Sequence, residues 1–514
     1  MQFGLDTPAA GRQPFDPAHA DIGALRAALD SGRLSSEQLV GYYLRRIERY
    51  DKAGPRINAL ITMNPRALEQ ARQLDVGAKT MVHKPMLYGI PFIAKDNYDT
   101  AGIETSGGSA ALKHSVPAVN AFVIQKLLDQ GAILIGKANM SELAASHGRL
   151  GYSSAGGLTL NPYNTARDAS GSSSGSAAGV AADFAAFALG TDTGGSVRAP
   201  ASVTGLAGLR PTLGLTSRSG VVPLSLTFDT TGVLARSVKD LAIVLDAIAG
   251  PDPGDTATLA QPLPGARYVE ALGTRSIRGA RLGVVGNFRG GNAEVDAVER
   301  TALDRLASLG AVLVPVTLPA SFEDLWNSVL GPVGEAEFKP QFERYLGTLA
   351  SSQPKTLARL IELSEAGDIA GSATPVNPAR LAALRAADAT SLADSPTYIR
   401  ILTQTIPGVR LELESLMAAH NLQALVFSTM SCPASPRFDR ADPSYVCLSQ
   451  DTYSAGYVAA AAGFPEITVN AGSISGNMPV GYSFMGLPYS ESRLIGLANA
   501  FQLAGPGGPA LPAL

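Results

Sequence analysis

One segment, Ser170 to Pro211, limits the possible folds of this chain more than any other. It reads SGSSSGSAAGVAADFAAFALGTDTGGSVRAPASVTGLAGLRP, so two loops of small residues flank an Ala-rich stretch. The stretch from Ser176 to Phe187 holds strong helix formers and almost no charge, which predicts a buried helix that fixes the two loops relative to each other. Isolated Gly and Ser runs are typical of flexible linkers, but linkers are not normally joined to an apolar helix. The segment therefore predicts a rigid site.

Candidate chemical groups stand on either side of this helix. Gly194 and Gly195 have no side chains, so consecutive backbone N–H groups there can converge on one developing negative charge. Ser196 follows directly. Far upstream, the apolar run Gly89 to Ala94 reads as a buried strand that ends at Lys95. A strand end is a suitable place for a catalytic group, and this one carries a cation.

Helical and extended patterns alternate along the chain. Residues 122–130 predict a helix that Gly131 ends, and the strand-like run 133–135 follows. The order recurs with a helix over 294–309 and a strand over 311–314, and residues 422–427 predict another strand. Near the start, Ser35 and Gln38 form a capping box before a helical face. The pattern is typical of an α/β fold.

Composition excludes several classes of function. The chain is 46% hydrophobic and only 17% charged, against about 25% in average proteins, which indicates a large core. Forty-one Lys and Arg against 44 Asp and Glu give a net charge of −3, so no overall positive field would hold nucleic acid or an anionic membrane. No run reaches the roughly 18 apolar residues of a membrane helix, and the N-terminus has no export signal. We predict a soluble, cytoplasmic protein, although an export signal removed earlier would leave no trace.

Metal and cofactor signals are weak. The two cysteines, Cys432 and Cys447, could pair, but they form neither a disulfide framework nor a four-ligand zinc site. The five histidines occur in no H-E-x-x-H, and the chain has no P-loop motif. We predict no metal and no cofactor. No functional role is assigned to His83, His114, His147 or Trp326.

The Ser170–Pro211 segment resembles the amidase signature family, whose pattern joins a Gly- and Ser-rich loop through a small-residue helix to G-T-D-x-G-G-S-[IV]-R-x-P-A. The resemblance covers most of the chain from about residue 20 to 505, with further family-like strings at GIPFIAKDN (89–97), GKANMSELA (136–144), GLRPTLGL (208–215), GFPEITVNAG (463–472) and MPVGYSFMG (478–486). Within the family, the chain is most similar to peptide amidases. The resemblance implies a large mixed β-sheet covered on both faces by helices.

The resemblance also implies a catalytic triad. Ser196 would be the nucleophile, Ser172 the bridging serine after a cis peptide bond from Gly171, and Lys95 the general base. The chemistry needs no histidine, because a buried lysine loses solvation and its pKa falls. A neutral amine could then take the Ser196 proton through the Ser172 hydroxyl, and Ser196 would form an acyl-enzyme that water hydrolyses.

The resemblance assigns neighbouring residues as well. It implies that the oxyanion is received by backbone N–H groups of residues 193–196, namely Thr193, Gly194, Gly195 and Ser196. Around the triad it places Ser173, Thr191, Asp192 and Arg198. Arg198 is expected to form a structural ion pair, with a clamp for a substrate carboxylate as the alternative. The backbone of Ala144, Ala145 and Ser146 is expected to face the substrate.

The predicted activity is hydrolysis of a carboxamide or related C–N bond. The substrate would be a small molecule: a peptide amide, an aryl or alkyl amide, or a carbamate, with esters cleaved as a side activity. We expect one amidase domain over 1–514, with an N-terminal helical part (1–80), a catalytic core (81–250), a variable helical region or cap (261–407) and a C-terminal part of the core (408–505). The sequence leaves a homodimer open.

Three alternatives compete with this hypothesis. Residues 171–175 satisfy G-x-S-x-G, the nucleophile elbow of α/β-hydrolase esterases, with Ser173 as nucleophile and His420 as the downstream histidine. The preceding residues do not read as the strand that this motif requires. A second alternative is the glutamine-hydrolysing subunit of an amidotransferase. A non-enzymatic binding protein is the third, and it predicts loss of Lys95, Ser172 or Ser196, all of which are present.

Overall fold

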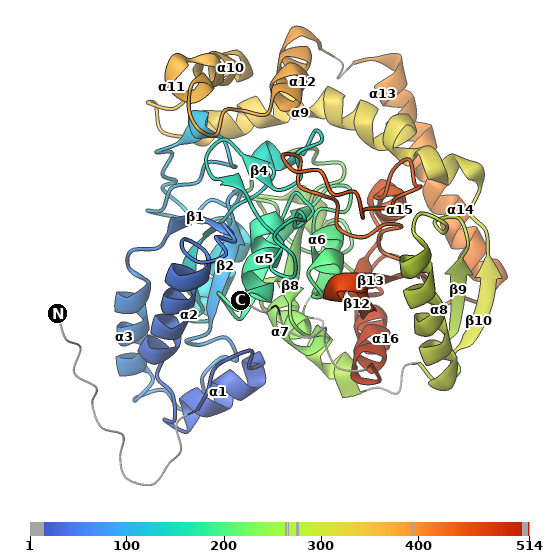
Figure 1. Ribbon diagram of the computed structural model, residues 1–514, viewed down its shortest axis with the longest axis horizontal. Helices are drawn as coiled ribbons and strands as arrows, with labels where there is room; N and C mark the ends of the chain where they lie inside the picture. Colours follow the sequence, from blue (N-terminus) through green and yellow to red (C-terminus); the bar gives the residue numbers. More distant parts are fainter. Residues whose placement is uncertain are drawn as a thin grey trace.

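The computed structural model describes residues 15–262, 265, 267–273, 277–391, 394–505, 512 and 514. The N-terminal residues behind the export-signal prediction lie almost wholly outside these. At the centre is a mixed sheet of eleven strands (Figure 1). In spatial order the strands are β1 (Leu60–Met63), β3 (Ile133–Ala138), β2 (Pro91–Lys95), β6 (Phe187–Asp192), β8 (Thr230–Ala235), β7 (Ala207–Arg210), β12 (Glu466–Ile474), β13 (Met478–Met485), β11 (Ala424–Ser428), β9 (Arg281–Val285) and β10 (Val312–Val316). The predicted fold class is confirmed.

The direction of the strands changes across the sheet. β2 runs parallel to both β3 and β6, and β9 runs parallel to both β10 and β11. The strands between these groups pair antiparallel. Because β2 and β6 are parallel neighbours, their C-terminal ends meet at one edge of the sheet. The ends of these two strands are Lys95 and Asp192.

The N-terminal part contains three helices, α1 (Ile22–Asp30), α2 (Ser36–Tyr50) and α3 (Ala67–Gly77). Ser35 and Gln38 form the predicted capping box at the start of α2. Residues 1–80 are not only helical, however, since β1 also belongs to them and pairs antiparallel with β3. Strand β1 thus forms one edge of the central sheet.

The Ala-rich helix is shorter than its composition predicts. Helix α5 covers Ser174–Ala181, and Phe187, the last residue of the predicted helix, instead begins β6. Asp183 has a positive φ of 61°, which ends helical geometry between them. Phe187 pairs with Phe92 in β2 and with Ala235 in β8, so sheet pairing overrides the helix propensity of the Ala-rich run. The predicted burial is confirmed for every residue of α5.

Other predicted elements occur close to their expected bounds. They are α4 (Phe122–Asp129), which Gly131 follows with a φ of 78°, then β3, α8 (Ala293–Ser308), β10 and β11. The remaining core helices are α6 (Arg198–Val203), α7 (Val238–Ile248), α15 (Ser454–Ala462) and α16 (Glu491–Leu503). No helix in the described ranges is both long and apolar enough to cross a membrane.

The described part of the region 261–407 is not only helical. Its first half contributes the strands β9 and β10 to the sheet, and helix α8 between them packs against the sheet. Its second half consists of helices that form a separate layer at the top of Figure 1, beyond the ends of the central elements. These are α9 (Gly331–Thr348), α10 (Leu357–Glu365), α11 (Gly367–Ala370), α12 (Pro378–Ala389) and α13 (Pro396–Arg400), after which α14 (Ile406–Ala419) returns to β11. Only this second half fits the predicted cap.

Candidate active site

Lys95 and Ser172 meet at the C-terminal end of β2. The Lys95 Nζ donates hydrogen bonds to Ser172 Oγ at 2.8 Å and to Thr191 Oγ1 at 2.7 Å. Thr191 lies near the end of the parallel neighbour β6, and Ser172 stands in the loop that enters α5. The sheet and the helix thus bring together three side chains that are far apart in the sequence.

The surroundings of Lys95 favour a neutral amine. Lys95 is completely buried. Burial lowers the pKa of Lys95 to about 7, and the more distant charges of Asp192 and Asp229 only partly oppose this effect. Among the described residues, no ion pair within 4 Å involves Lys95. Near pH 7 about half of the Lys95 side chains can therefore accept a proton.

Ser196 lines a cavity of about 690 Å³, a volume typical of small-molecule sites. The Ser173 N–H donates to the Ser196 carbonyl at 3.2 Å, so the two serine loops are in direct contact. The Gly171–Ser172 peptide bond is cis, as expected. Predicted substrate-facing and oxyanion residues also line this cavity: Ala144, Ala145, Ser146, Thr193 and Gly194.

One of the predicted oxyanion donors is already engaged. The N–H of Gly195 donates to Asp192 Oδ1 at 2.9 Å, so it is not free to bind a substrate oxygen. Gly195 has a φ of 115°, a conformation that favours glycine, and this bends the loop around the Asp192 carboxylate. The backbone groups of Thr193, Gly194 and Ser196 remain as candidate donors.

Arg198 is enclosed in a buried network of charges. Its guanidinium pairs with Asp192 at 2.8 Å and with Glu466 at 2.5 Å, and Arg210 also contacts Asp192. Burial alone would raise the pKa of Asp192, but the charges and hydrogen bonds of Arg198 and Arg210 outweigh it and hold that pKa far below its usual range. Arg198 is completely buried, which fits the structural ion pair and not the substrate clamp.

The residues of the nucleophile-elbow alternative lie in unrelated surroundings. The Ser173 hydroxyl is fully buried, where it donates to the Thr191 carbonyl at 3.2 Å and accepts from the Thr191 N–H. His420 is exposed at the C-terminal end of α14, where its carbonyl accepts a hydrogen bond from Arg281. Ser173 therefore supports the β6 strand.

The cavity is completed by residues to which the sequence patterns assign no role. They are His147, Trp326, Phe338, Arg380, Tyr453 and Tyr457. Arg380, from α12, is 4% exposed and lies over the Phe338 ring, and burial lowers its pKa to about 10. Burial likewise lowers the pKa of His147 to about 4. Trp326, Phe338 and Arg380 belong to the region 261–407 and the other three to the core, so no single local pattern points to the site, which forms where the two parts meet.

Asp229 is a further residue that the sequence did not reveal. No sequence motif marks Asp229. Its carboxylate accepts hydrogen bonds from the Thr193 hydroxyl at 2.6 Å and from the N–H groups of Leu224 and Ser225. These bonds hold the side chain of Thr193 beside the cavity. Burial raises the pKa of Asp229, and the hydrogen bonds from Thr193, Leu224 and Ser225 oppose that rise.

Comparisons with known proteins identify the family of this chain. The family model described as Amidase matches residues 38–495. An Arabidopsis thaliana protein described as a probable amidase is 35% identical and aligns with 95% of this chain and 91% of its own length. A glutamyl-tRNA(Gln) amidotransferase subunit from Prochlorococcus marinus is 32% identical over 93% and 96% of the two chains. The native peptide amidase of Stenotrophomonas maltophilia has a TM-score of 0.87, 38% identity, and coverage of 97% and 99%.

These matches extend over nearly the whole chain. The chain therefore belongs to the amidase family and is a hydrolase that acts on the C–N bonds of amides.

Proposed function

We propose that Ser196 is the nucleophile, that Ser172 transfers its proton, and that Lys95 is the general base. One observation carries this proposal: the Lys95 Nζ lies 2.8 Å from Ser172 Oγ in a site where burial brings the lysine pKa to about 7. A neutral amine at this distance can accept a proton, whereas a solvated lysine would stay charged.

In the proposed reaction, Ser196 Oγ forms a bond to the amide carbonyl carbon, and its proton passes through the Ser172 hydroxyl to Lys95. The carbonyl oxygen becomes an oxyanion that accepts hydrogen bonds from backbone N–H groups of Thr193, Gly194 and Ser196, where loss of one donor costs about 10²- to 10³-fold in rate. The C–N bond then breaks as the proton on Lys95 moves to the leaving amine. Water attacks the acyl-enzyme by the same route, which releases the acid and restores Ser196.

The substrate is proposed to be a small carboxamide. A cavity of about 690 Å³ with a largely apolar lining fits an uncharged molecule or the end of a short peptide. The similarity to the peptide amidase of S. maltophilia favours a peptide C-terminal amide. Aryl or alkyl amides and carbamates are the other candidates, and esters are a side activity, because the same acyl-enzyme forms from each.

A glutamine-hydrolysing subunit of an amidotransferase is the second candidate, since several relatives at 32% identity are described as amidotransferase subunits. The two functions predict different behaviour of the isolated chain. A free-standing amidase hydrolyses simple amides without a partner, whereas an amidotransferase subunit needs one for full activity.

A panel of substrates tests the proposal: a peptide amide, an anilide, a carbamate and an ester, each incubated with the purified chain. We expect hydrolysis of at least one amide, and a loss of about 10⁴-fold or more in Ser196→Ala with folding unchanged. His420→Ala is the matched control and should keep wild-type rates. Wild-type rates in Ser196→Ala would refute the triad. Loss of activity in His420→Ala would instead support the nucleophile-elbow alternative, in which Ser173 is the nucleophile.

Location, assembly and domain organisation stay predictions. We keep a single amidase domain over 1–514, with a homodimer left open, and we name no nucleic-acid or membrane partner. The cytoplasmic location is harder to maintain, because disulfides persist mainly in oxidising compartments and Cys432 is bonded to Cys447. Thiol trapping in cells followed by mass spectrometry tests the location, and light scattering tests the assembly.

A further inference from the structure

Tyr453 touches both loops that carry the triad serines. Its hydroxyl lies 2.5 Å from Ser170 Oγ and accepts the Gly171 N–H at 3.3 Å, immediately before Ser172. Its ring packs against Gly195, since a Cβ on that glycine would lie 3.3 Å from the ring. Tyr453 also lines the cavity. One side chain therefore fixes the turn before the bridging serine relative to the loop before the nucleophile.

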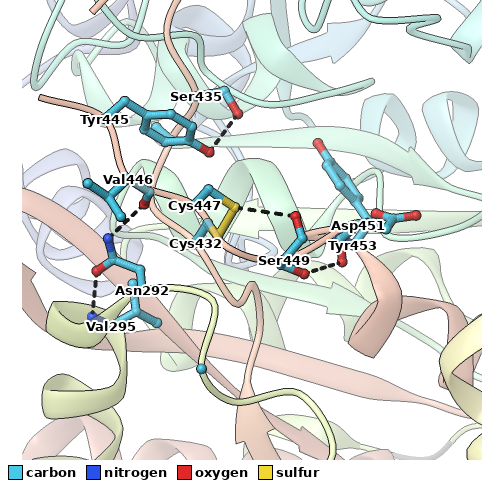
Figure 2. The surroundings of a disulfide bond; sticks show 12 residues. Asn292, Val295, Cys432, Ser435, Tyr445, Val446, Cys447, Ser449, Asp451 and Tyr453 are labelled. Carbon is cyan, nitrogen blue, oxygen red and sulfur yellow. Dashed lines mark hydrogen bonds between the residues drawn. A yellow bond between two sulfur atoms is a disulfide. The ribbon is translucent and has the colours of Figure 1, made fainter. Parts of the chain in front are cut away.

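A short chain of contacts holds Tyr453 from its N-terminal side. The Tyr453 N–H donates to Asp451 Oδ1 at 2.8 Å, and the Ser449 hydroxyl donates to the Asp451 carbonyl at 3.0 Å. The Ser449 carbonyl in turn lies 3.8 Å from Cys447 Sγ. Figure 2 shows that these residues lead directly from the Cys432–Cys447 disulfide to Tyr453.

The disulfide is the covalent bond between this segment and the core, beside hydrogen bonds such as that from the Leu448 N–H to the Gly291 carbonyl. Residues 429–453, between β11 and α15, form neither helix nor strand, and the apolar side chains of Val446 and Leu448 are 52% and 76% exposed. The part around these two exposed side chains gains little from burial and loses conformational entropy when ordered. Cys432, by contrast, is buried beside the end of β11. The crosslink thus joins the exposed segment to the core.

The segment also lies along the run of residues that leads into the active site. Asp442 forms an ion pair with Arg167 at 2.8 Å, and the Ser435 carbonyl accepts the Asp168 N–H at 2.9 Å. Residues 167–170 continue directly into Gly171 and Ser172. Displacement of the segment would therefore act on the bridging serine by two routes, through Tyr453 and through residues 167–170.

We propose that Tyr453 is a positioning residue for Ser172 and that the Cys432–Cys447 disulfide holds it there, so that the oxidised protein is the fully active form. The inference rests on the proposed triad. Reduction by a dithiol breaks the S–S bond, gives two cysteine thiols, and converts the dithiol to its own disulfide. The segment then loses its crosslink, and the Tyr453 hydroxyl leaves Gly171 for part of the time.

The first test is Tyr453→Phe, with Tyr445→Phe as the matched control on the same segment. Within the described part of the chain, the Tyr445 hydroxyl forms its hydrogen bond with the Ser435 hydroxyl, at 3.3 Å, away from the triad loops. We expect Tyr453→Phe to lower kcat about tenfold with KM and the melting temperature nearly unchanged, because a misplaced reactive group slows chemistry more than binding. Tyr445→Phe should keep the wild-type kcat. Equal kcat in the two variants would overturn the positioning role.

The second test combines the two features. Cys447→Ser, or treatment with dithiothreitol checked by thiol counting, should lower kcat about tenfold in the wild type but less than about twofold in Tyr453→Phe, since both changes act through one contact. Equal losses in both backgrounds, or no loss in the wild type, would contradict the inference. Thiol-treated full-length protein serves where the variant does not fold.

A readout without turnover separates this inference from the proposed function. Hydrogen exchange of the backbone over residues 168–175 should speed up on reduction and in Tyr453→Phe, but not in Tyr445→Phe. If hydrolysis proves independent of Ser196, the proposed triad is wrong. The exchange data still show whether the disulfide and Tyr453 hold the backbone before Ser172. Unchanged exchange after complete reduction would refute the role of the disulfide in holding this backbone, even if the protein is an active amidase.

Discussion

Lys95 and Lys137 stand at the ends of neighbouring parallel strands and are equally buried, but they face different groups. Lys137 lies 3.4 Å from the Asp96 carboxylate and donates to the Tyr98 carbonyl and the Thr105 hydroxyl. Lys95 meets only neutral oxygens within hydrogen-bond distance in the described structure, those of Ser172 and Thr191.

The register of the two strands explains the difference. Lys137 is aligned with Ala94, so Lys95, one residue further on, projects to the opposite face of the sheet. Burial lowers the pKa of both lysines, but for Lys137 the nearby Asp96 opposes the effect directly. A buried lysine beside a carboxylate stabilises structure, whereas one beside hydroxyls is suited to proton transfer.

The largest expected effect is that of Lys95→Met on turnover. Removing the amine removes the acceptor for the Ser172 proton, so kcat/KM should fall by about 10⁴-fold, or ~5 kcal/mol of activation free energy. The free energy of unfolding should change by less than about 1.5 kcal/mol, because an apolar chain of similar volume replaces a buried amine. Steady-state kinetics and urea denaturation measure the two quantities. Near-normal kcat/KM would show that Lys95 is not the base.

Lys137→Met should give the opposite pattern. It leaves the Asp96 carboxylate buried without its cation, which typically costs about 3–5 kcal/mol of folding stability. The protein that remains folded should keep kcat within about tenfold of the wild type, since Lys137 does not line the cavity. Urea denaturation and kinetics normalised to folded protein check this. A Lys137→Met variant that is stable but inactive would contradict the different roles assigned to the two lysines.

The next largest expected effect is the pH dependence of kcat/KM in the wild type. Because the active form of Lys95 is neutral, kcat/KM should rise with pH through about 7 and level off above it, falling about tenfold per pH unit on the acid side. The same pKa shift makes stability depend on pH. Between about pH 7 and pH 10, Lys95 binds a proton in the unfolded chain but not in the folded protein, so the free energy of unfolding rises with pH. An acid limb with a midpoint near about pH 4 would assign the base to a carboxylate.

The smallest effect is that of single hydroxyls beside each lysine. Thr191→Val removes an acceptor from the Lys95 ammonium, so the charged form loses support and the acid limb should move to lower pH by roughly half a unit, ~0.7 kcal/mol. Thr105→Val removes the equivalent acceptor from Lys137 and is the matched control, with no shift expected. Rate measurements from about pH 5 to about pH 9 resolve the difference. A shift in the control as large as that in Thr191→Val would contradict the comparison.

Much of the site could be predicted from short-range pattern. The spacing from Ser172 to Ser196, the glycines at 194 and 195, and the strand that ends at Lys95 all survive in the structure, because loop geometry and strand ends depend on neighbouring residues. The predicted Ala-rich helix is too long, since pairing of Phe187 with β2 and β8 is invisible to local propensity. The prediction of a free Gly195 N–H is wrong, because Asp192 binds it.

An α/β fold and the family follow from the sequence alone, because hydrophobic periodicity and motifs a few residues long encode them, and the same motifs predict which residues carry the chemistry. The folded chain alone shows that Lys137 faces Asp96, that Asp192 and Glu466 enclose Arg198, and that Cys432 bonds Cys447. Each of those outcomes depends on strand register or on loops that meet in the folded chain, and no local pattern encodes such contacts.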